Sequence, residues 1–278
     1  LALVPVFIAA VVYFRWHAVR LVGISVAVCV LTEYVVRKCR HQETTVGDGS
    51  AVITGLLLAF IVPPALPSWM MAVGAFFAIF LVKELFGGLG MNIFNPALAA
   101  RAILLAAFPR HMTMWSRPID AVTTATPLGI LKENLPLDLP SYGDLFIGTI
   151  PGSLGETSAL AILIGGLFLI WRRVIRWEVP AVNIAAIALF SLLLGRDPLF
   201  EILAGGVMLG AFFMMTDMVT TPVTRLGNII FAVGCAAITM VIRVWGGYPE
   251  GVCYSILIMN AFTPLIDISI RPRTLGAS

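Results

Sequence analysis

Long apolar stretches alternate with short polar turns along almost the whole chain. A bilayer core of about 30 Å is crossed by roughly 20 apolar residues in a helix, and by fewer where protein surrounds the segment. The pattern predicts ten such segments, near residues 1–14, 19–37, 50–62, 68–85, 93–109, 157–171, 179–194, 199–216, 227–243 and 250–267. Short segments of this kind are typical of helices that break around an internal site. We therefore expect an all-α, polytopic integral membrane protein.

Composition supports this class. Of the 278 residues, 59% are hydrophobic and only 12% are charged, whereas a soluble domain carries about 25% charged residues. The basic residues stand at segment ends and do not gather on one polar face, as they would in a nucleic-acid-binding protein. We expect membrane lipid to surround most of the chain, and we expect no nucleic-acid partner.

The first apolar run is predicted to be a membrane segment. It has no basic region before it and no small-x-small site after it, so it does not resemble a signal peptide. The chain starts at Leu1 inside this run, and we expect further residues before it in the natural protein.

Lysine and arginine in the short loops set the expected orientation. Basic residues follow the second, sixth and eighth segments and occupy the tail: Arg37, Lys38, Arg40, Arg172, Arg173, Arg176, Arg225, Arg271 and Arg273. Even numbers of segments separate these loops, so they face one side, the cytoplasm, as do both termini. The counter-evidence is four basic residues on the side predicted to be extracytoplasmic: Arg15, Arg20, Arg110 and Arg117.

The polar stretch from about residue 109 to 156 is the one long loop, and it follows the fifth segment. It is therefore predicted to be extracytoplasmic. We divide the chain into a first membrane half (1–108), this loop (109–156) and a second membrane half (157–278).

Two Gly- or Pro-containing elbows adjoin apolar segments. The first, 86–96, carries Asn92 and Asn95, and the second, 216–225, carries Asp217 and several threonines. Non-helical backbone at membrane depth needs protein or a water-filled cavity to satisfy it, which suggests a cofactor or ion site. Ordinary turns with Asn and Asp as caps are an equally good interpretation.

Two charges are expected within the membrane, where a charge is paired or functional by default. Glu33 stands one turn before Arg37, and Arg37 together with the membrane interface could satisfy it. Arg101 has no acid near it in sequence. An anionic cofactor or a carboxylate from another helix would suit its guanidinium, and we favour the structural ion pair.

The four cysteines form no CxxC motif, so neither an iron–sulfur nor a zinc site is indicated and no metal ligands are predicted. Cys29, Cys235 and Cys253 lie in apolar runs and are expected to be buried small hydrophobic residues. Cys39 lies in a basic loop.

The long loop contains the hydroxyl-rich run 120–126, with three threonines and one acid. Taken alone, these threonines could be turn and cap residues. The pattern Asp-x-x-Thr-x-Ala-Thr, formed here by Asp120, Thr123, Ala125 and Thr126, resembles the signature of the transferase that attaches FMN through its phosphate to the last threonine. It departs from the commoner motif at Ala121, where glycine or serine is usual.

Residues 86–101, the turn 248–251 and the run 260–267 are also similar to the D subunit of the bacterial Rnf complex (RnfD). They resemble its homologue as well, the B subunit of the sodium-pumping NADH:quinone reductase (NqrB). The resemblance spans essentially the whole chain.

The resemblance implies a redox subunit that is not catalytic alone. It would carry FMN on Thr126 and work with membrane, flavin-bearing and iron–sulfur Rnf subunits in a bacterial inner membrane. Electrons would pass between ferredoxin and NAD, coupled to sodium or proton movement, and a flavin transferase would act during maturation.

The resemblance also implies ten helices in two five-helix halves, similar to urea channels, and a second, non-covalent flavin such as riboflavin. Asn92, Asn95 and Arg101 are the places where we would expect that flavin or an ion.

Three alternatives stay open. The chain could be the quinone-reductase subunit, which the identity of its neighbouring subunits would reveal. It could instead be a flavin-free solute channel or transporter, or a purely structural membrane protein. A yellow purified protein would exclude the last two.

Overall fold

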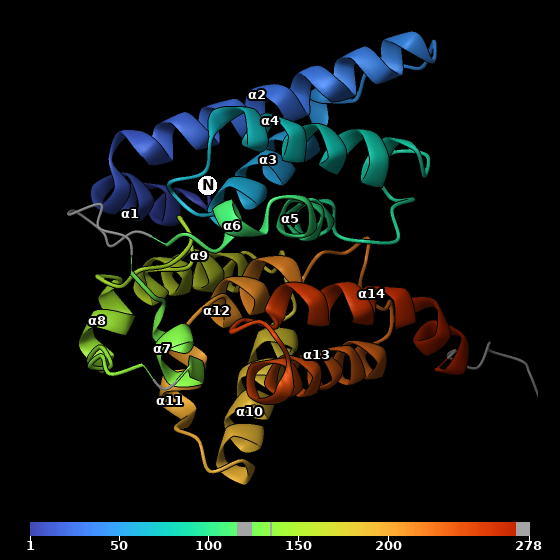
Figure 1. Ribbon diagram of the computed structural model, residues 1–278. Helices are drawn as coiled ribbons and strands as arrows, with labels where there is room; N and C mark the ends of the chain where they lie inside the picture. The colour runs from blue at the N-terminus through green and yellow to red at the C-terminus, as the bar shows by residue number, and fades with distance from the viewer. Residues whose placement is uncertain (116–123, 134, 271–278) are drawn as a thin grey trace, which may run out of the picture.

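The computed structural model describes residues 1–115, 124–133 and 135–270, and every regular element in these ranges is helical (Figure 1). The α-helices are α1 (Val4–Phe14), α2 (Trp16–Cys39), α3 (Ser50–Phe60), α4 (Ser68–Phe77), α5 (Pro96–Ala107), α6 (Pro109–Met112), α7 (Pro127–Glu133), α8 (Tyr142–Ile147), α9 (Ala159–Trp171), α10 (Glu178–Leu193), α11 (Pro198–Leu203), α12 (Val207–Leu209), α13 (Arg225–Trp245) and α14 (Val252–Ser269). A 3-10 turn, η1 (Val46–Asp48), precedes α3, and the π-helices η2 (Ala78–Glu84) and η3 (Gly210–Met214) continue α4 and α12.

The predicted all-helical class is confirmed, and helices occupy each predicted apolar stretch. Among the described residues, α2, α13 and α14 are long and apolar enough to cross a membrane. The helices in two other stretches are shorter than predicted, since α3 has 11 residues and α5 has 12. At 1.5 Å per residue each is roughly 17 Å long, about half of a bilayer core.

Helices α1 to α5 pack together, and α9 to α14 form a second group (Figure 1). Helix α1 contacts α9, and α5 contacts α14, so the two groups meet along these helices. Large apolar side chains such as Leu31, Ile164 and Leu193 stay exposed on the outside. Lipid tails are as apolar as these side chains, so this surface is suited to a bilayer.

The end of α3 lies in the interior and depends on a later loop. Ile61 and Val62 are buried but not helical, so their backbone groups need partners inside the protein. The Gly155 N–H donates to the Phe60 carbonyl at 2.8 Å, and the Leu154 N–H donates to the Val62 carbonyl at 3.3 Å. The close approach requires glycine, because a Cβ on Gly155 would overlap the Phe60 side chain. The end of the long loop is therefore an internal part of the fold.

A matching break interrupts the stretch 198–214 between α11 and α12. Gly205 has a φ of +73° there, a left-handed conformation that favours glycine. The Ala204 carbonyl accepts a hydrogen bond from Arg243 at 3.0 Å, and the Gly206 N–H donates to the Glu250 carboxylate. Charged side chains thus replace the helical hydrogen bonds that the break removes.

Candidate functional site

Thr126 begins helix α7. Its Oγ1 accepts a hydrogen bond from the Gly129 N–H at 3.1 Å, the geometry of a helix cap. Thr124, Ala125 and Thr126 are each half-buried, so the Thr126 hydroxyl is held in place but not sealed from the surroundings. The other two predicted motif residues, Asp120 and Thr123, lie outside the described residues.

A small cavity of about 40 Å³ lies beside Thr126. Its wall includes Trp115, Ser153, Glu156 and Glu250. A volume of this size holds about one water molecule. The cavity is therefore too small for a flavin ring, and its importance is that it brings two carboxylates close to Thr126.

Arg101 pairs with both of these carboxylates. One guanidinium nitrogen lies 3.4 Å from Glu156 Oε1, and another lies 2.7 Å from Glu250 Oε2. Glu156 also accepts a hydrogen bond from the Ser153 hydroxyl. The ion-pair interpretation of Arg101 agrees with this geometry, and the partners come from loops far away in sequence.

Glu156 precedes α9 and is buried. Burial and the neighbouring Glu250 carboxylate raise the pKa of Glu156 well above its ordinary value, against the opposing pull of Arg101 and Arg243. Arg101 instead holds the pKa of Glu250 below its ordinary value. Glu156 is therefore the carboxyl of the pair that takes up a proton first as pH falls.

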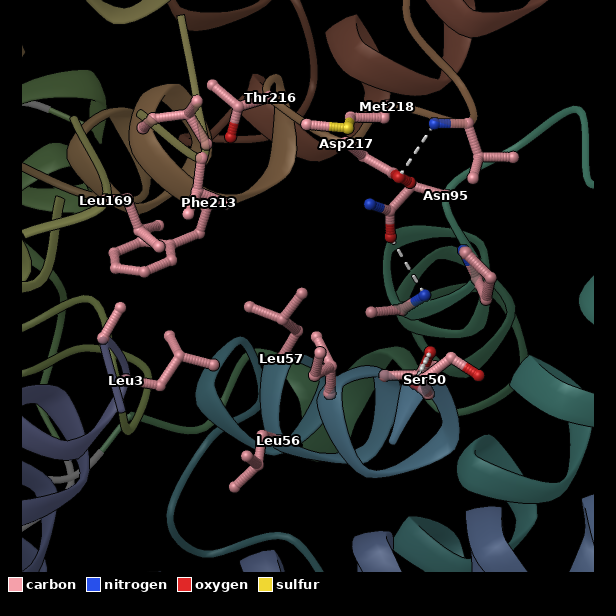
Figure 2. Close-up of a pocket in the computed structure, with 18 of the residues that line it drawn as sticks. Leu3, Ser50, Leu56, Leu57, Asn95, Leu169, Phe213, Thr216, Asp217 and Met218 are labelled. Atoms are coloured by element: carbon pink, nitrogen blue, oxygen red, sulfur yellow. Dashed lines mark hydrogen bonds between the residues drawn. The ribbon is translucent and has the colours of Figure 1, made fainter. Parts of the chain in front are cut away.

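A second cavity, of about 700 Å³, opens between the two groups of helices (Figure 2). Apolar side chains such as Leu57, Leu169 and Phe213 line one end. Polar groups also line it: Ser50, Thr54, Lys83, Asn92, Asn95, Thr216 and Asp217. Ser50 and Asn95 lie at the other end, and Thr216 lies beside Phe213 (Figure 2). Both elbows thus border one cavity, whereas Arg101 is not among its lining residues.

The two elbow asparagines line the cavity and also make local hydrogen bonds. The Asn95 side chain accepts from the backbone N–H groups of Ala97 and Leu98 at 3.1 and 3.3 Å and so starts α5. Asn92 donates its side-chain amide to the Phe94 carbonyl at 3.1 Å within the elbow. For Asn95 the cap interpretation and the cavity-wall interpretation therefore hold together.

Asn260 joins the two elbows, a role that sequence reasoning missed. It is fully buried on α14. Its Oδ1 accepts from the Asn95 N–H at 3.2 Å, and its Nδ2 donates to the Thr220 carbonyl at 3.0 Å. An isolated amide inside the apolar stretch 250–267 was the available signal, because a polar group in a membrane helix needs a partner.

Comparison with known proteins places the chain in a family. A model of the NQR2, RnfD, RnfE family matches residues 1–276, which is nearly the whole chain. The chain belongs to this family.

Relatives in the NQR2, RnfD, RnfE family cover the chain almost completely. The D subunit of the Na⁺-translocating ferredoxin:NAD⁺ oxidoreductase complex of Acetobacterium woodii is 51% identical, over 100% of this chain and 89% of that protein. The D subunit of the proton-translocating complex of Clostridium ljungdahlii is 47% identical, over 99% of this chain and 89% of that protein. The D subunit of an ion-translocating oxidoreductase complex of Halorhodospira halophila is 38% identical, over 99% of this chain and 89% of that protein. The resemblance inferred from the sequence is confirmed.

The predicted partner of Glu33 was wrong in this family member. Glu33 pairs with Lys83 at 2.7 Å and accepts a hydrogen bond from the Thr45 hydroxyl. Arg37 instead pairs with Glu84 at 3.2 Å. Tertiary packing therefore overrides the helical spacing that pointed from Glu33 to Arg37. Lys83 lies within the predicted apolar segment 68–85, and its side chain extends from that segment to Glu33.

The cysteines behave as predicted, since Cys29, Cys235 and Cys253 are buried and none of the four forms a disulfide. Cys39 is exposed. Within the described ranges, no cluster of three or more His, Cys, Asp or Glu side chains is arranged to hold a metal ion.

Proposed function

We propose that the chain is the D subunit of an ion-translocating ferredoxin:NAD⁺ oxidoreductase complex in a bacterial inner membrane. Full-length similarity to relatives with that name supports the proposal. Relatives of nearly equal identity are named for sodium and for protons, so the proposal covers ion translocation without choosing the ion. The partners are the other subunits of the complex.

In this proposal ten membrane segments form two halves, as in urea channels. The half-length helices α3 and α5 and the break between α11 and α12 are compatible with it, because transporter-like folds use discontinuous helices around a midplane site. The termini face the cytoplasm, and the loop with Thr126 faces the opposite side.

We further propose that Thr126 carries FMN through a phosphoester. The motif formed by Asp120, Thr123, Ala125 and Thr126, which the transferase would recognise, supports this proposal. The half-buried Thr126 side chain leaves its hydroxyl within reach of such an enzyme. The ester oxygen can still accept the Gly129 N–H, so the helix cap survives attachment. The flavin supplies reversible electron acceptance, and the protein supplies its position and surroundings.

The large cavity is the proposed place of a second, non-covalent flavin such as riboflavin. Its volume of about 700 Å³ lies in the range of ligand pockets, roughly 300–1,000 Å³. Apolar walls suit the ring system, and Asn92, Asn95 and Lys83 offer hydrogen-bonding groups at one end. Arg101 has no part in this proposed site.

In-gel fluorescence tests the covalent flavin. The chain, coexpressed with a flavin transferase, should keep yellow-green fluorescence after denaturing electrophoresis, and Thr126→Ala should lose it. Thr124→Ala is the matched control, because it removes a neighbouring hydroxyl outside the motif and should keep the band. A fluorescent Thr126→Ala chain would overturn the assignment, and a colourless wild-type complex would favour a flavin-free channel.

Flavin released on denaturation tests the second site. Leu57→Trp places a larger ring in the cavity and should abolish released flavin while the covalent band remains. Ile164→Trp, on the exposed outer face, should release as much flavin as wild type. Equal release from both variants would contradict the cavity assignment.

A further inference from the structure

Lys132, near the end of α7, donates to three backbone carbonyls at and just beyond the end of α13. Its Nζ lies 3.1 Å from the Ile242 oxygen, 2.5 Å from the Gly246 oxygen and 2.6 Å from the Tyr248 oxygen. An ammonium group has three N–H donors and no acceptor. All three donors are therefore used.

The end of α13 is well suited to such a cation. The last carbonyls of a helix have no partner within it, and the helix dipole places partial negative charge there. The contact joins segments more than 100 residues apart, since Lys132 and Ile242 differ by 110 positions. It therefore ties the loop that carries Thr126 to the second group of helices.

Apolar packing also holds α7, one turn before Lys132 on the same face of the helix. Leu128 belongs to a small separate core with Leu145, Ile150, Phe200 and Ala204, and Figure 1 shows α7 beside α11. An apolar contact alone is non-directional. The Lys132 contact adds the direction, because hydrogen bonds to charged groups are geometrically specific and stronger than neutral ones.

We infer that Lys132 is a positioning residue for Thr126: it fixes α7 against the end of α13 and thereby sets where a group attached to Thr126 stands. The inference rests on the proposed function. Thr126 caps the same short helix, so movement of α7 would move the attachment point. A tethered redox group depends on such placement, because the rate of electron transfer falls as the distance to its partner grows.

Three variants test this. Lys132→Met removes the donors but keeps most of the aliphatic stem, and Lys132→Arg restores a cation. Glu133→Gln is the matched control, because Glu133 is an exposed residue on the same helix. All three are made in the full chain within its complex, with and without coexpression of the flavin transferase, so that Thr126 stays in place.

The first measurement is hydrogen–deuterium exchange of the 127–133 peptide in the chain made without the transferase, in which Thr126 is unmodified and still caps α7. Loss of charge-assisted hydrogen bonds should speed exchange about tenfold or more in Lys132→Met, with wild-type rates in the other two variants. Exchange of the 16–39 peptide should not change, which shows that the fold is intact. Unchanged exchange of 127–133 in Lys132→Met would overturn the inference.

The second measurement is fluorescence anisotropy of the attached flavin. Lys132→Met should lower the anisotropy, and Lys132→Arg should return it to the wild-type value. Wild-type anisotropy in Lys132→Met would also overturn the inference. Absence of a covalent flavin band in the wild-type chain would instead refute the proposed function, and the exchange experiment would still report on the anchor.

Discussion

Removing the Arg101 guanidinium should destabilise the protein strongly. The side chain is buried and lies between the carboxylates of Glu156 and Glu250, at 3.4 and 2.7 Å. Arg101→Met keeps much of the apolar stem but leaves two buried acids facing each other. Breaking a buried ion pair in this way costs about 3–5 kcal/mol. At roughly 2–4 °C per kcal/mol, the unfolding midpoint should fall on the order of 10 °C.

The same reasoning predicts recovery when the charges are removed together. A triple variant with Arg101→Met, Glu156→Gln and Glu250→Gln removes the guanidinium together with both acids, while Arg243 keeps Glu201 as its partner. Replacing a whole buried ion cluster is often neutral. The triple variant should regain more than half of the lost midpoint. Glu133→Gln is the control, because it removes a carboxylate at the exposed surface and should leave the unfolding midpoint unchanged.

Buried thiols provide the assay. Cys29, Cys235 and Cys253 are buried and Cys39 is exposed, so a Cys39→Ser background reports unfolding through a thiol-reactive dye in detergent. The reasoning is refuted if Arg101→Met melts at the wild-type temperature. It is equally refuted if the triple variant is no more stable than the single one.

Two further variants test the same region. The carboxyl of Glu156 has a folded pKa of about 8 against an ordinary value of 4.5. The native state therefore binds its proton more tightly, and wild-type stability should fall as pH rises between these values. Glu156→Gln should flatten that slope in circular-dichroism melts, and an unchanged slope would speak against the raised pKa of Glu156. Gly206→Ala would place a Cβ 2.6 Å from Glu250 Oε1 and 2.7 Å from Glu156 Oε1 and should cost about 1–3 kcal/mol. Gly247→Ala enters open space and should melt close to wild type, so equal melting of the two glycine variants would count against the packing described.

The sequence predicted the helical class because apolar periodicity and length constrain membrane segments directly. It indicated that some segments are short, but not which groups satisfy their ends. The Leu154–Gly155 backbone satisfies the end of α3, and the Asn260 side chain accepts the Asn95 N–H at the start of α5. Those partners come from distant parts of the chain. Local pattern carries no information about such partners.

The charged clusters show the same limit. Arg101 could be recognised as a residue that needs a partner, but Glu156 and Glu250 lie 55 and 149 positions away. Glu33 was assigned to Arg37 by helical spacing, whereas Lys83, 50 positions away, is its partner. Thr126 was singled out by family resemblance, since a threonine at the start of a short helix is otherwise an ordinary cap.

The central claim is that Thr126 carries one covalent FMN. Intact mass of the purified chain, followed by fragment mapping of the 109–156 loop, measures this directly. The chain should be heavier by one FMN less one water, with the added mass on a fragment that contains Thr126 and absent from Thr126→Ala. An unmodified chain from cells that contain an active flavin transferase, or added mass on a fragment without Thr126, would contradict it.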